Sequence, residues 1–341
     1  MAPAASGKGA PPSIFNLTSN ISINDPSSSS LPHRARTTPI IAIGIFFELG
    51  LNYKHRGDPG ITYNTPGKME RIPSVDINMR SERRPSPPSR PSTQEWRIRR
   101  DLAAAYRLAA LFQWDDMIGT HFSARVPTAA GEPDQFLINP YGMLFEEITA
   151  SSLIKVDVDG NILADTAYPV NRAGFIIHSA VHMARPEIGC VMHLHTDDGV
   201  AVSALEEGLL PLNQSAMVVR DRVAVHEYEG IAVEPREQAR IVADLGDRDL
   251  MFLRNHGTLA AGRTVAETFA SMYALEKACT FQVRTLSMNR PWRKPAAGIL
   301  RKMERKPNDE RRAQVLADYA CNAVWPAMLR KLERICPDYK E

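Results

Sequence analysis

The chain has 341 residues, enough for about two domains on a prior of roughly 150 residues each. Its 41 basic and 39 acidic side chains leave a formal charge of only +2, which argues against the strong field of a nucleic-acid-binding protein. The four cysteines are far apart in the sequence, which excludes a disulfide scaffold and a cysteine-rich zinc finger. Unpaired cysteines are typical of a reducing compartment, so we expect a cytoplasmic protein.

Residues 1–92 are rich in proline, serine and arginine. Such a composition buries too little apolar surface to offset the entropy lost on ordering, so we expect a disordered N-terminal extension. A second interpretation is that translation begins at Met69 or Met79. The apolar run at residues 40–47 is too short for a bilayer, which takes about 20 apolar residues, so no membrane association is predicted.

Helix-like and strand-like patterns alternate from about residue 93 onward. In chain order they predict a helix, two strands, a helix, a strand, a short helix, a strand and a long helix, at residues 95–113, 136–139, 153–158, 174–183, 190–195, 199–205, 250–253 and 264–286. Alternating strands and helices are typical of α/β layered domains. We therefore place one α/β domain at residues 93–290 and a helical C-terminal tail at residues 291–341.

Three histidines carry the candidate chemistry. His193 and His195 are two apart in a strand pattern, so their imidazoles point to the same face of the sheet. His256 follows the predicted strand at residues 250–253 and is the natural third ligand of an open metal site. Imidazole ligands suit zinc and iron alike, so the spacing leaves the metal open. The alternative is a pair of half-buried histidines without a metal, since an HxH pair by itself is weak evidence.

Three common enzyme signatures are absent from the sequence. Gly60 and Gly67-Lys68 are separated by six residues instead of four, so they do not form a phosphate-binding loop. No GxGxxG motif follows a strand pattern, and no GxSxG motif is present. A P-loop enzyme, a Rossmann dehydrogenase and the commonest serine hydrolase are therefore not supported.

Five motifs follow one another between residues 96 and 286: Gly119-Thr120-His121-Phe122-Ser123-Ala124-Arg125, Asn139-Pro140-Tyr141-Gly142, Ala173-Gly174-Phe175 with His178 and Arg185-Pro186-Glu187, His193-Leu194-His195-Thr196, and Arg254-Asn255-His256-Gly257. In this order they resemble the class II aldolase/adducin family. The resemblance implies a three-layer α/β/α sandwich with a central, largely antiparallel or mixed sheet. It also implies a homotetramer with sites near subunit interfaces.

The same resemblance assigns the metal ligands. It implies that His193, His195 and His256 bind a divalent metal, most often Zn²⁺, with Fe²⁺ or Mn²⁺ as alternatives. The partner it implies is a small oxygenated or carboxylate-bearing substrate. As a Lewis acid, the metal could polarise neighbouring oxygens of such a substrate.

The sequence departs from the aldolase branch of this family at the residues around the metal. Gly174 stands where that branch carries a general-base glutamate, and Arg172 and Ala173 replace its phosphate-binding serines. His121 stands where asparagine is usual. In these respects the chain resembles the adducin-like branch, although it lacks the long neck and lysine-rich tail of adducin. Phosphate recognition and the usual proton transfer are therefore not expected to carry over.

Another residue would have to move the substrate proton in place of the glutamate. The candidates are polar residues that the pattern places in turn-like segments, namely His121, Tyr141, His226, Glu227 and Tyr228. From these we predict His121, Tyr141 and Tyr228 as catalytic residues. The alternative for each is a structural role in a turn or loop.

Three further residues are predicted to bind the substrate. Arg125 could meet a substrate carboxylate in a bidentate pair, or could support its own loop through hydrogen bonds. Asn139 and Gly142 could shape an anion-binding turn through backbone amides.

Three functions are compatible with these residues. The first, which we favour, is a divalent-metal-dependent lyase that cleaves a carbon–carbon bond or decarboxylates a small hydroxy or keto substrate. The second is an iron-dependent oxygenase or decarboxylase that uses the same three histidines. The third is a non-catalytic, adducin-like protein that binds actin filaments or other partners. The metal's identity distinguishes the first two, and the absence of a carboxylate at Gly174 supports the third.

Overall fold

The computed structural model describes residues 91–230, 235–304, 306 and 309–341. Residues 1–90 of the extension expected at residues 1–92 therefore lie outside the described residues. The alternative starts at Met69 and Met79 lie outside them too. Within the described ranges, none of the helices is long and apolar enough to cross a bilayer.

A seven-stranded mixed sheet forms the centre of the fold. Its strands are β1 (His121–Val126), β2 (Gln135–Ile138), β3 (Ile154–Val156), β4 (Cys190–Leu194), β5 (Val223–His226), β6 (Leu250–Leu253) and β7 (Gly257–Gly262). They lie in the order β3-β2-β1-β4-β7-β6-β5, and all neighbours are antiparallel except the parallel pair β5 and β6. β4 is therefore paired on both sides, by β1 and by β7.

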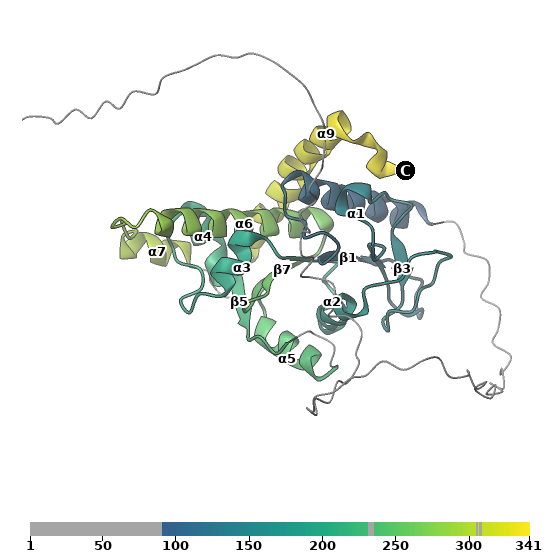
Figure 1. The fold of residues 1–341 in the computed structure, drawn as a ribbon, viewed down its shortest axis with the longest axis horizontal. Helices are drawn as coiled ribbons and strands as arrows, with labels where there is room; N and C mark the ends of the chain where they lie inside the picture. Colours follow the sequence, from purple (N-terminus) through teal and green to yellow (C-terminus); the bar gives the residue numbers. More distant parts are fainter. Residues whose placement is uncertain (1–90, 231–234, 305, 307–308) are drawn as a thin grey trace, which may run out of the picture. The chain divides into compact units, whose positions relative to one another are not determined.

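Helices cover both faces of this sheet. They are α1 (Thr93–Leu111), α2 (Arg172–Ala184), α3 (Asp197–Ser203), α4 (Gln214–Val219), α5 (Pro235–Leu245), α6 (Val265–Ser287), α7 (Ala297–Met303), α8 (Glu310–Tyr319) and α9 (Trp325–Ile335). Short turns of other helix types are η1 (Phe145–Glu147), η2 (Arg220–Arg222), η3 (Ala320–Val324) and η4 (Pro337–Lys340). α1, α3, α4 and α6 pack on one face and α2 and α5 on the other, which is the three-layer α/β/α sandwich expected (Figure 1).

Each face of the sheet has its own hydrophobic core, because alternate residues of a strand point to opposite faces. In β4, Met192 and Leu194 belong to the core beneath α1 and α6. Val191 belongs to the core beneath α2 and α5. His193 is two residues from Val191 and shares its face. The histidine motif therefore faces the α2 side of the sheet.

The two longest helices begin where their sequences supply a capping side chain. The hydroxyl of Ser92 accepts a hydrogen bond from the backbone N–H of Glu95 at 3.1 Å, at the start of α1. The hydroxyl of Thr264 does the same for the N–H of Glu267 at 3.1 Å, at the start of α6. Each cap satisfies an N–H group that the first turn of a helix leaves without a partner.

Three strands correct the predicted secondary structure. His121 opens β1 and His226 ends β5, whereas we had expected both histidines in turn-like segments. His256 is followed by β7, a strand that was not predicted between His256 and the long helix expected at residues 264–286. β1 and β7 lack the apolar runs that mark β4 and β6. All three strands are defined by pairing with neighbours that are distant in sequence.

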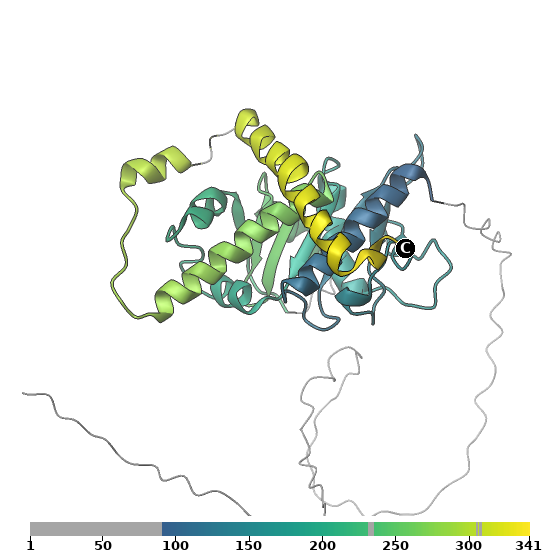
Figure 2. The same cartoon turned by 90° about the horizontal axis from the view of Figure 1, so that it is seen from above.

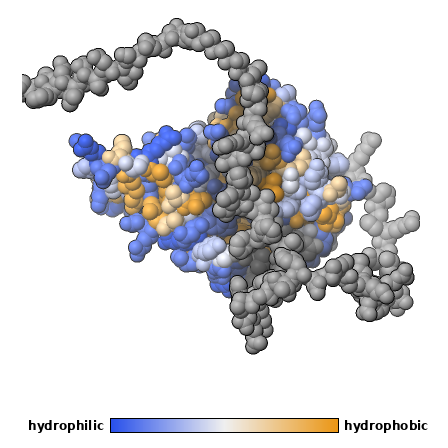
Figure 3. Space-filling model, viewed as in Figure 1, coloured by the Kyte–Doolittle hydropathy of each residue, from blue (hydrophilic) through white to orange (hydrophobic). Residues whose placement is uncertain are grey.

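The C-terminal helices return to the α1 side of the domain. Trp325 at the start of α9 donates from its indole Nε1 to Asp101 of α1 at 3.0 Å, and its ring packs 5.6 Å from that of Phe269 on α6. The view from above shows α9 lying across this region (Figure 2). The exterior seen in Figure 3 is largely hydrophilic, with apolar side chains gathered in separate patches.

Candidate functional site

His193, His195 and His256 come together at the end of β4. His193 lies in β4, His195 follows it, and His256 lies in the turn between β6 and β7. The Nε2 atom of His193 is 2.8 Å from that of His195 and 3.2 Å from that of His256. Among the described residues, these three form a group whose ligand atoms all lie within 4.8 Å of one another. The arrangement is consistent with a divalent metal site.

The outer nitrogens of two of these rings are held by hydrogen bonds. His193 Nδ1 donates to the backbone carbonyl of Thr258 at 2.9 Å, and His195 Nδ1 is 3.1 Å from a carboxylate oxygen of Asp116. A neutral ring that donates from Nδ1 carries a lone pair on Nε2. Carboxylate and carbonyl partners of this kind orient histidine ligands in metal sites.

The spacing of these lone pairs fits a small cation. Two unprotonated nitrogens 2.8 Å apart repel one another unless a proton or a cation lies between them. Tetrahedral zinc with bonds of about 2.0–2.1 Å would separate its nitrogen ligands by roughly 3.3 Å, close to the spacing found here. Burial lowers the pKa of His193 well below its usual value and that of His256 to about 4. A neutral ring is the form that binds metal.

Close backbone packing brings the third histidine to the other two. Asn255, the residue before His256, adopts a left-handed conformation with φ of 55°. Gly257, the residue after it, packs so tightly that a Cβ atom there would lie 2.2 Å from the carbonyl oxygen of Leu194. The absence of a side chain at Gly257 therefore lets β7 approach the ligand-bearing end of β4.

A buried glutamate connects the two ligand segments from the opposite face of the sheet. Glu276 of α6 accepts hydrogen bonds from the hydroxyl of Thr258, at 2.6 Å, and from that of Thr196. Thr196 follows His195 in the chain, and Thr258 accepts the hydrogen bond of His193. Burial raises the pKa of Glu276 to about 7. Glu276 was not predicted from the sequence, because its helical spacing matches the apolar face of α6.

His121 lies beside the triad formed by His193, His195 and His256. Its ring fills the space that a side chain at position 174 would take. It is the cross-strand partner of His193, and the two rings are 5.2 Å apart. A Cβ atom built on Gly174, in the first turn of α2, would lie 2.1 Å from His121 Nε2. The imidazole at position 121 therefore occupies the volume next to position 174.

A chain of buried hydrogen bonds leads from His121 away from the triad. His121 Nδ1 is 2.9 Å from His178 Nε2, and His178 Nδ1 is 2.7 Å from the hydroxyl of Ser123. The same hydroxyl is 2.8 Å from His182 Nε2, and His182 Nδ1 is 3.2 Å from the carbonyl of Ile188. Burial lowers the pKa of His121 and of His182 to about 3, and that of His178 well below its usual value.

This series of hydrogen bonds from His121 to Ile188 was not predicted from the sequence. Together with the triad, it joins six of the seven histidines in the described residues. The only available signal was the spacing of His178 and His182, which puts them on one face of a helix. That spacing does not reveal that Ser123 on β1 lies between them.

Arg125 lies in β1, four positions from His121, which is roughly 13 Å along a strand. Its guanidinium donates to the carbonyls of His182 and Ile188 and pairs with Asp134. It also lies 5.2 Å from the centre of the Phe136 ring. These contacts support the structural alternative for Arg125, because they hold its side chain against the C-terminal end of α2.

Two other predicted substrate-binding residues follow β2. Asn139 is buried, and its side-chain oxygen lies 2.9 Å from the hydroxyl of Tyr106 on α1. Gly142 is exposed and has φ of 102°, a conformation that favours glycine. Tyr141, a predicted catalytic residue, is partly buried between them and donates its backbone N–H to the carbonyl of Pro169 at 2.9 Å. Their roles in binding and catalysis stay predictions.

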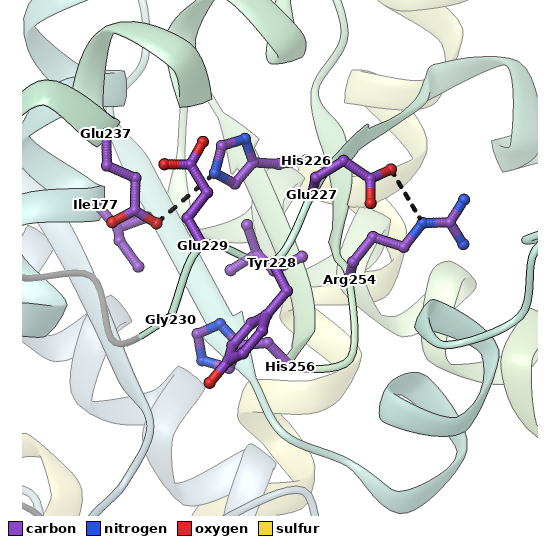
Figure 4. Close-up of a pocket in the computed structure, with 10 residues that line it drawn as sticks. Ile177, His226, Glu227, Tyr228, Glu229, Gly230, Glu237, Arg254 and His256 are labelled. Carbon is purple, nitrogen blue, oxygen red and sulfur yellow. Dashed lines mark hydrogen bonds and ion pairs between the residues drawn. The ribbon is translucent and has the colours of Figure 1, made fainter.

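A pocket lies beside His256 on the α5 side, where the segment after β5 passes (Figure 4). Tyr228 lines it with a half-exposed side chain, and Glu227 is paired with Arg254 at 3.5 Å. His226 is buried, with Nδ1 2.7 Å from Asp244. The pocket thus brings Tyr228 and His256 to one surface, while the ring of His226 is held by α5.

Comparisons with known proteins agree with this geometry. Residues 100–283 match the family model described as class II aldolase and adducin N-terminal domain. A Caulobacter vibrioides protein assigned by its name to the class 2 aldolases is 52% identical over 252 residues, which are 73% of this chain and 94% of that protein. Alpha-adducin of Mus musculus is 46% identical over 193 residues, which are 56% of this chain but only 26% of that protein.

A solved structure shows the same arrangement of elements. The crystal structure of an aldolase II superfamily protein from Pseudomonas syringae superposes with a TM-score of 0.65 at 47% sequence identity. The superposition covers 73% of this chain and 97% of that structure.

Proposed function

The chain belongs to the class II aldolase/adducin family, and from this premise we propose that it is a divalent-metal-dependent lyase. Its reaction is the cleavage of a carbon–carbon bond, or a decarboxylation, in a small hydroxy or keto substrate. The observation that carries the proposal is the convergence of the ring nitrogens of three histidines.

His193, His195 and His256 would hold the metal, for which we propose Zn²⁺, with Fe²⁺ or Mn²⁺ as alternatives. A metal in this position supplies a Lewis acid that stabilises negative charge on substrate oxygens. The protein contributes the orientation of the rings, through the carbonyl of Thr258 and the carboxylate of Asp116.

His121 is the side chain that we assign to moving the substrate proton. Its ring lies beside His193 and occupies the volume next to Gly174, where the aldolase branch is expected to carry its glutamate. Tyr228 is a second candidate, since it lines the pocket beside His256 (Figure 4). We do not assign Arg125 to the substrate, because its guanidinium is engaged by α2 and Asp134.

Elemental analysis of the purified protein tests the metal site. We expect about one zinc, iron or manganese ion per chain, and its loss in a His193→Ala/His195→Ala variant that keeps its fold by circular dichroism. His226→Ala is a matched control, because it removes a buried histidine that is held by Asp244 instead of the triad. The absence of metal from the wild-type protein, even after reconstitution with each ion, would contradict the proposal.

The identity of the metal and an activity screen then separate two enzymes. Zinc in the protein, together with release of an aldehyde, a ketone or carbon dioxide from hydroxy or keto acids, supports the lyase. Iron together with oxygen consumption supports the oxygenase that imidazole ligands also permit.

A non-catalytic, adducin-like role is the second candidate. The lack of a carboxylate at Gly174 and the 46% identity to alpha-adducin favour it. Co-sedimentation with actin filaments at low salt tests this role, and absence of the chain from the pellet would exclude binding to actin.

Assembly forms part of the proposal as well. We propose a homotetramer, as the family resemblance implies, and light scattering coupled to size-exclusion chromatography measures the mass. A monomer that retains full activity would contradict it.

A further inference from the structure

The hydrogen bonds that run from Ile188 to His121 have only one consistent direction. A backbone carbonyl accepts hydrogen bonds and cannot donate them. The carbonyl of Ile188 lies 3.2 Å from His182 Nδ1, so that nitrogen carries the proton. Since a neutral imidazole has one N–H group, the Nε2 atom of His182 then has a bare lone pair.

The serine hydroxyl transmits this direction to the next ring. Ser123 Oγ is 2.8 Å from the bare Nε2 of His182, so its single proton points to His182. The oxygen can then only accept from His178 Nδ1, which lies 2.7 Å away and therefore carries a proton. Reversal of either bond would place two lone pairs face to face at these distances.

The proton position on His121, the ring beside the triad, follows in the same way. His178 donates from Nδ1, so its Nε2 is bare and accepts a proton from His121 Nδ1 at 2.9 Å. A neutral His121 that donates from Nδ1 has its lone pair on Nε2. That atom is the one that a Cβ at Gly174 would meet at 2.1 Å.

We propose that His178, Ser123 and His182 are positioning residues, which hold His121 in the tautomer with the proton on Nδ1 and the lone pair on Nε2. The atom presented next to Gly174 is then a proton acceptor, as the carboxylate of a glutamate there would be. The use of this acceptor in catalysis rests on the proposed function, whereas the tautomer itself does not.

Burial makes this assignment stable. The side chains of His121, Ser123, His178 and His182 are all at most 3% exposed, so water does not offer them alternative partners. A buried polar network of this kind is favourable only when every member has its partner. Burial also lowers the pKa values of the three histidines, which keeps the rings neutral and fixes one proton on each.

Magic-angle-spinning NMR of the full chain, purified as above and labelled with ¹⁵N in the histidine rings, tests the proposal. Protonated and bare ring nitrogens have well-separated shifts, and His121→Gln, His178→Gln and His182→Gln variants assign the signals. We expect all three histidines to be neutral, with the proton on Nδ1. A proton on Nε2 of His121 would overturn the proposal.

A serine variant tests whether the network is the cause. Ser123→Ala removes the link between His178 and His182, and we expect His121 to become a mixture of tautomers. Ser179→Ala is the matched control, because Ser179 is a buried serine of α2 that donates to the carbonyl of Ile176 instead. If Ser123→Ala leaves His121 in one tautomer, the network does not hold it.

The metal content of the same samples separates this inference from the proposed function. Metal in the protein with the wrong His121 tautomer would refute the inference alone. The expected tautomer in a chain that binds no metal would refute the proposed function alone.

Discussion

At the scale of single residues, the contact between His121 and Gly174 shows that two positions 53 apart in sequence share one volume. Replacement of a glycine inside a helix by alanine normally raises the free energy of unfolding by about 0.5–1 kcal/mol. Here the new methyl group would overlap a buried ring that is hydrogen-bonded to His178. Overpacking of this kind costs about 1–3 kcal/mol, which outweighs the helical gain.

We therefore expect Gly174→Ala to lower the melting temperature of the metal-free protein by several degrees. In a His121→Ala background the same substitution should be neutral or stabilising, because the overlapping ring is gone. A double-mutant cycle measures the coupling between the two positions. Strictly additive effects would show that the two side chains do not compete for space.

Glu276 gives the stability of the chain a pH dependence of defined sign. Its folded pKa of about 7 lies above the unfolded value of 4.5, so the folded state binds a proton that the unfolded state has released. Stability from this group is therefore full below pH 4.5 and is lost as the pH rises through 7. The loss is on the order of 3 kcal/mol.

Urea unfolding of metal-free wild type and Glu276→Gln between pH 4 and 8 measures this effect. We expect the wild type to lose stability relative to the variant as the pH rises, while contributions from the buried histidines cancel in the difference. Parallel pH profiles of the two proteins would mean that folding does not raise the pKa of Glu276.

At the scale of elements, the packing of β7 against β4 sets the position of His256. A Cβ atom on Gly257 would lie 2.2 Å from the carbonyl of Leu194, and neither backbone can move without disturbing the sheet. We expect Gly257→Ala to cost about 1–3 kcal/mol of stability and to weaken zinc binding. Thermal unfolding and competition with a chelator measure the two effects.

A glycine in open space supplies the control. A Cβ atom on Gly298 of α7 would have no atom within 4 Å, so Gly298→Ala should leave zinc binding unchanged. If Gly257→Ala behaved in the same way, the close approach of β4 and β7 would not be what places His256.

The elements that could be predicted from sequence are those that carry their own pattern. α1 and α6 have helical periodicity, and β4 and β6 are short apolar runs. β7 has mostly small residues and only one large apolar side chain, Leu259, between its two glycines, and it is a strand because β4 and β6 flank it. β1 carries polar residues on a buried face, where the histidines and Ser123 satisfy one another.

The candidate site was predictable to the same degree. The HxH motif and His256 identified the three residues that the structure brings together. The Asp116 carboxylate, Glu276 and the His178 network could not be found, because each acts through a contact that closes only when distant strands and helices pack.

At the scale of the whole molecule, the helices and strands in the part of the chain that the structure describes begin with α1 at Thr93. Among the described residues, the three hydrophobic clusters and the histidine network are formed by side chains from α1 onward. The proline-rich and serine-rich composition of the N-terminal segment predicts that it adds little to the stability of the fold. We expect deletion of residues 1–90 to leave the melting temperature and the metal content unchanged.

Differential scanning calorimetry of the full and shortened chains provides that comparison. A large fall in melting temperature on deletion would show that the N-terminal segment packs against the domain. The shortened chain begins at residue 91, beyond both Met69 and Met79, so the comparison does not depend on which methionine begins translation.

The volume shared by residues 121 and 174 also constrains how such a site changes over generations. A long side chain at 174 and an imidazole at 121 exclude each other, so a lineage cannot acquire one while it keeps the other in place. Exchange of an imidazole at 121 for a long side chain at 174 therefore requires the two positions to change together, or position 121 to become small first.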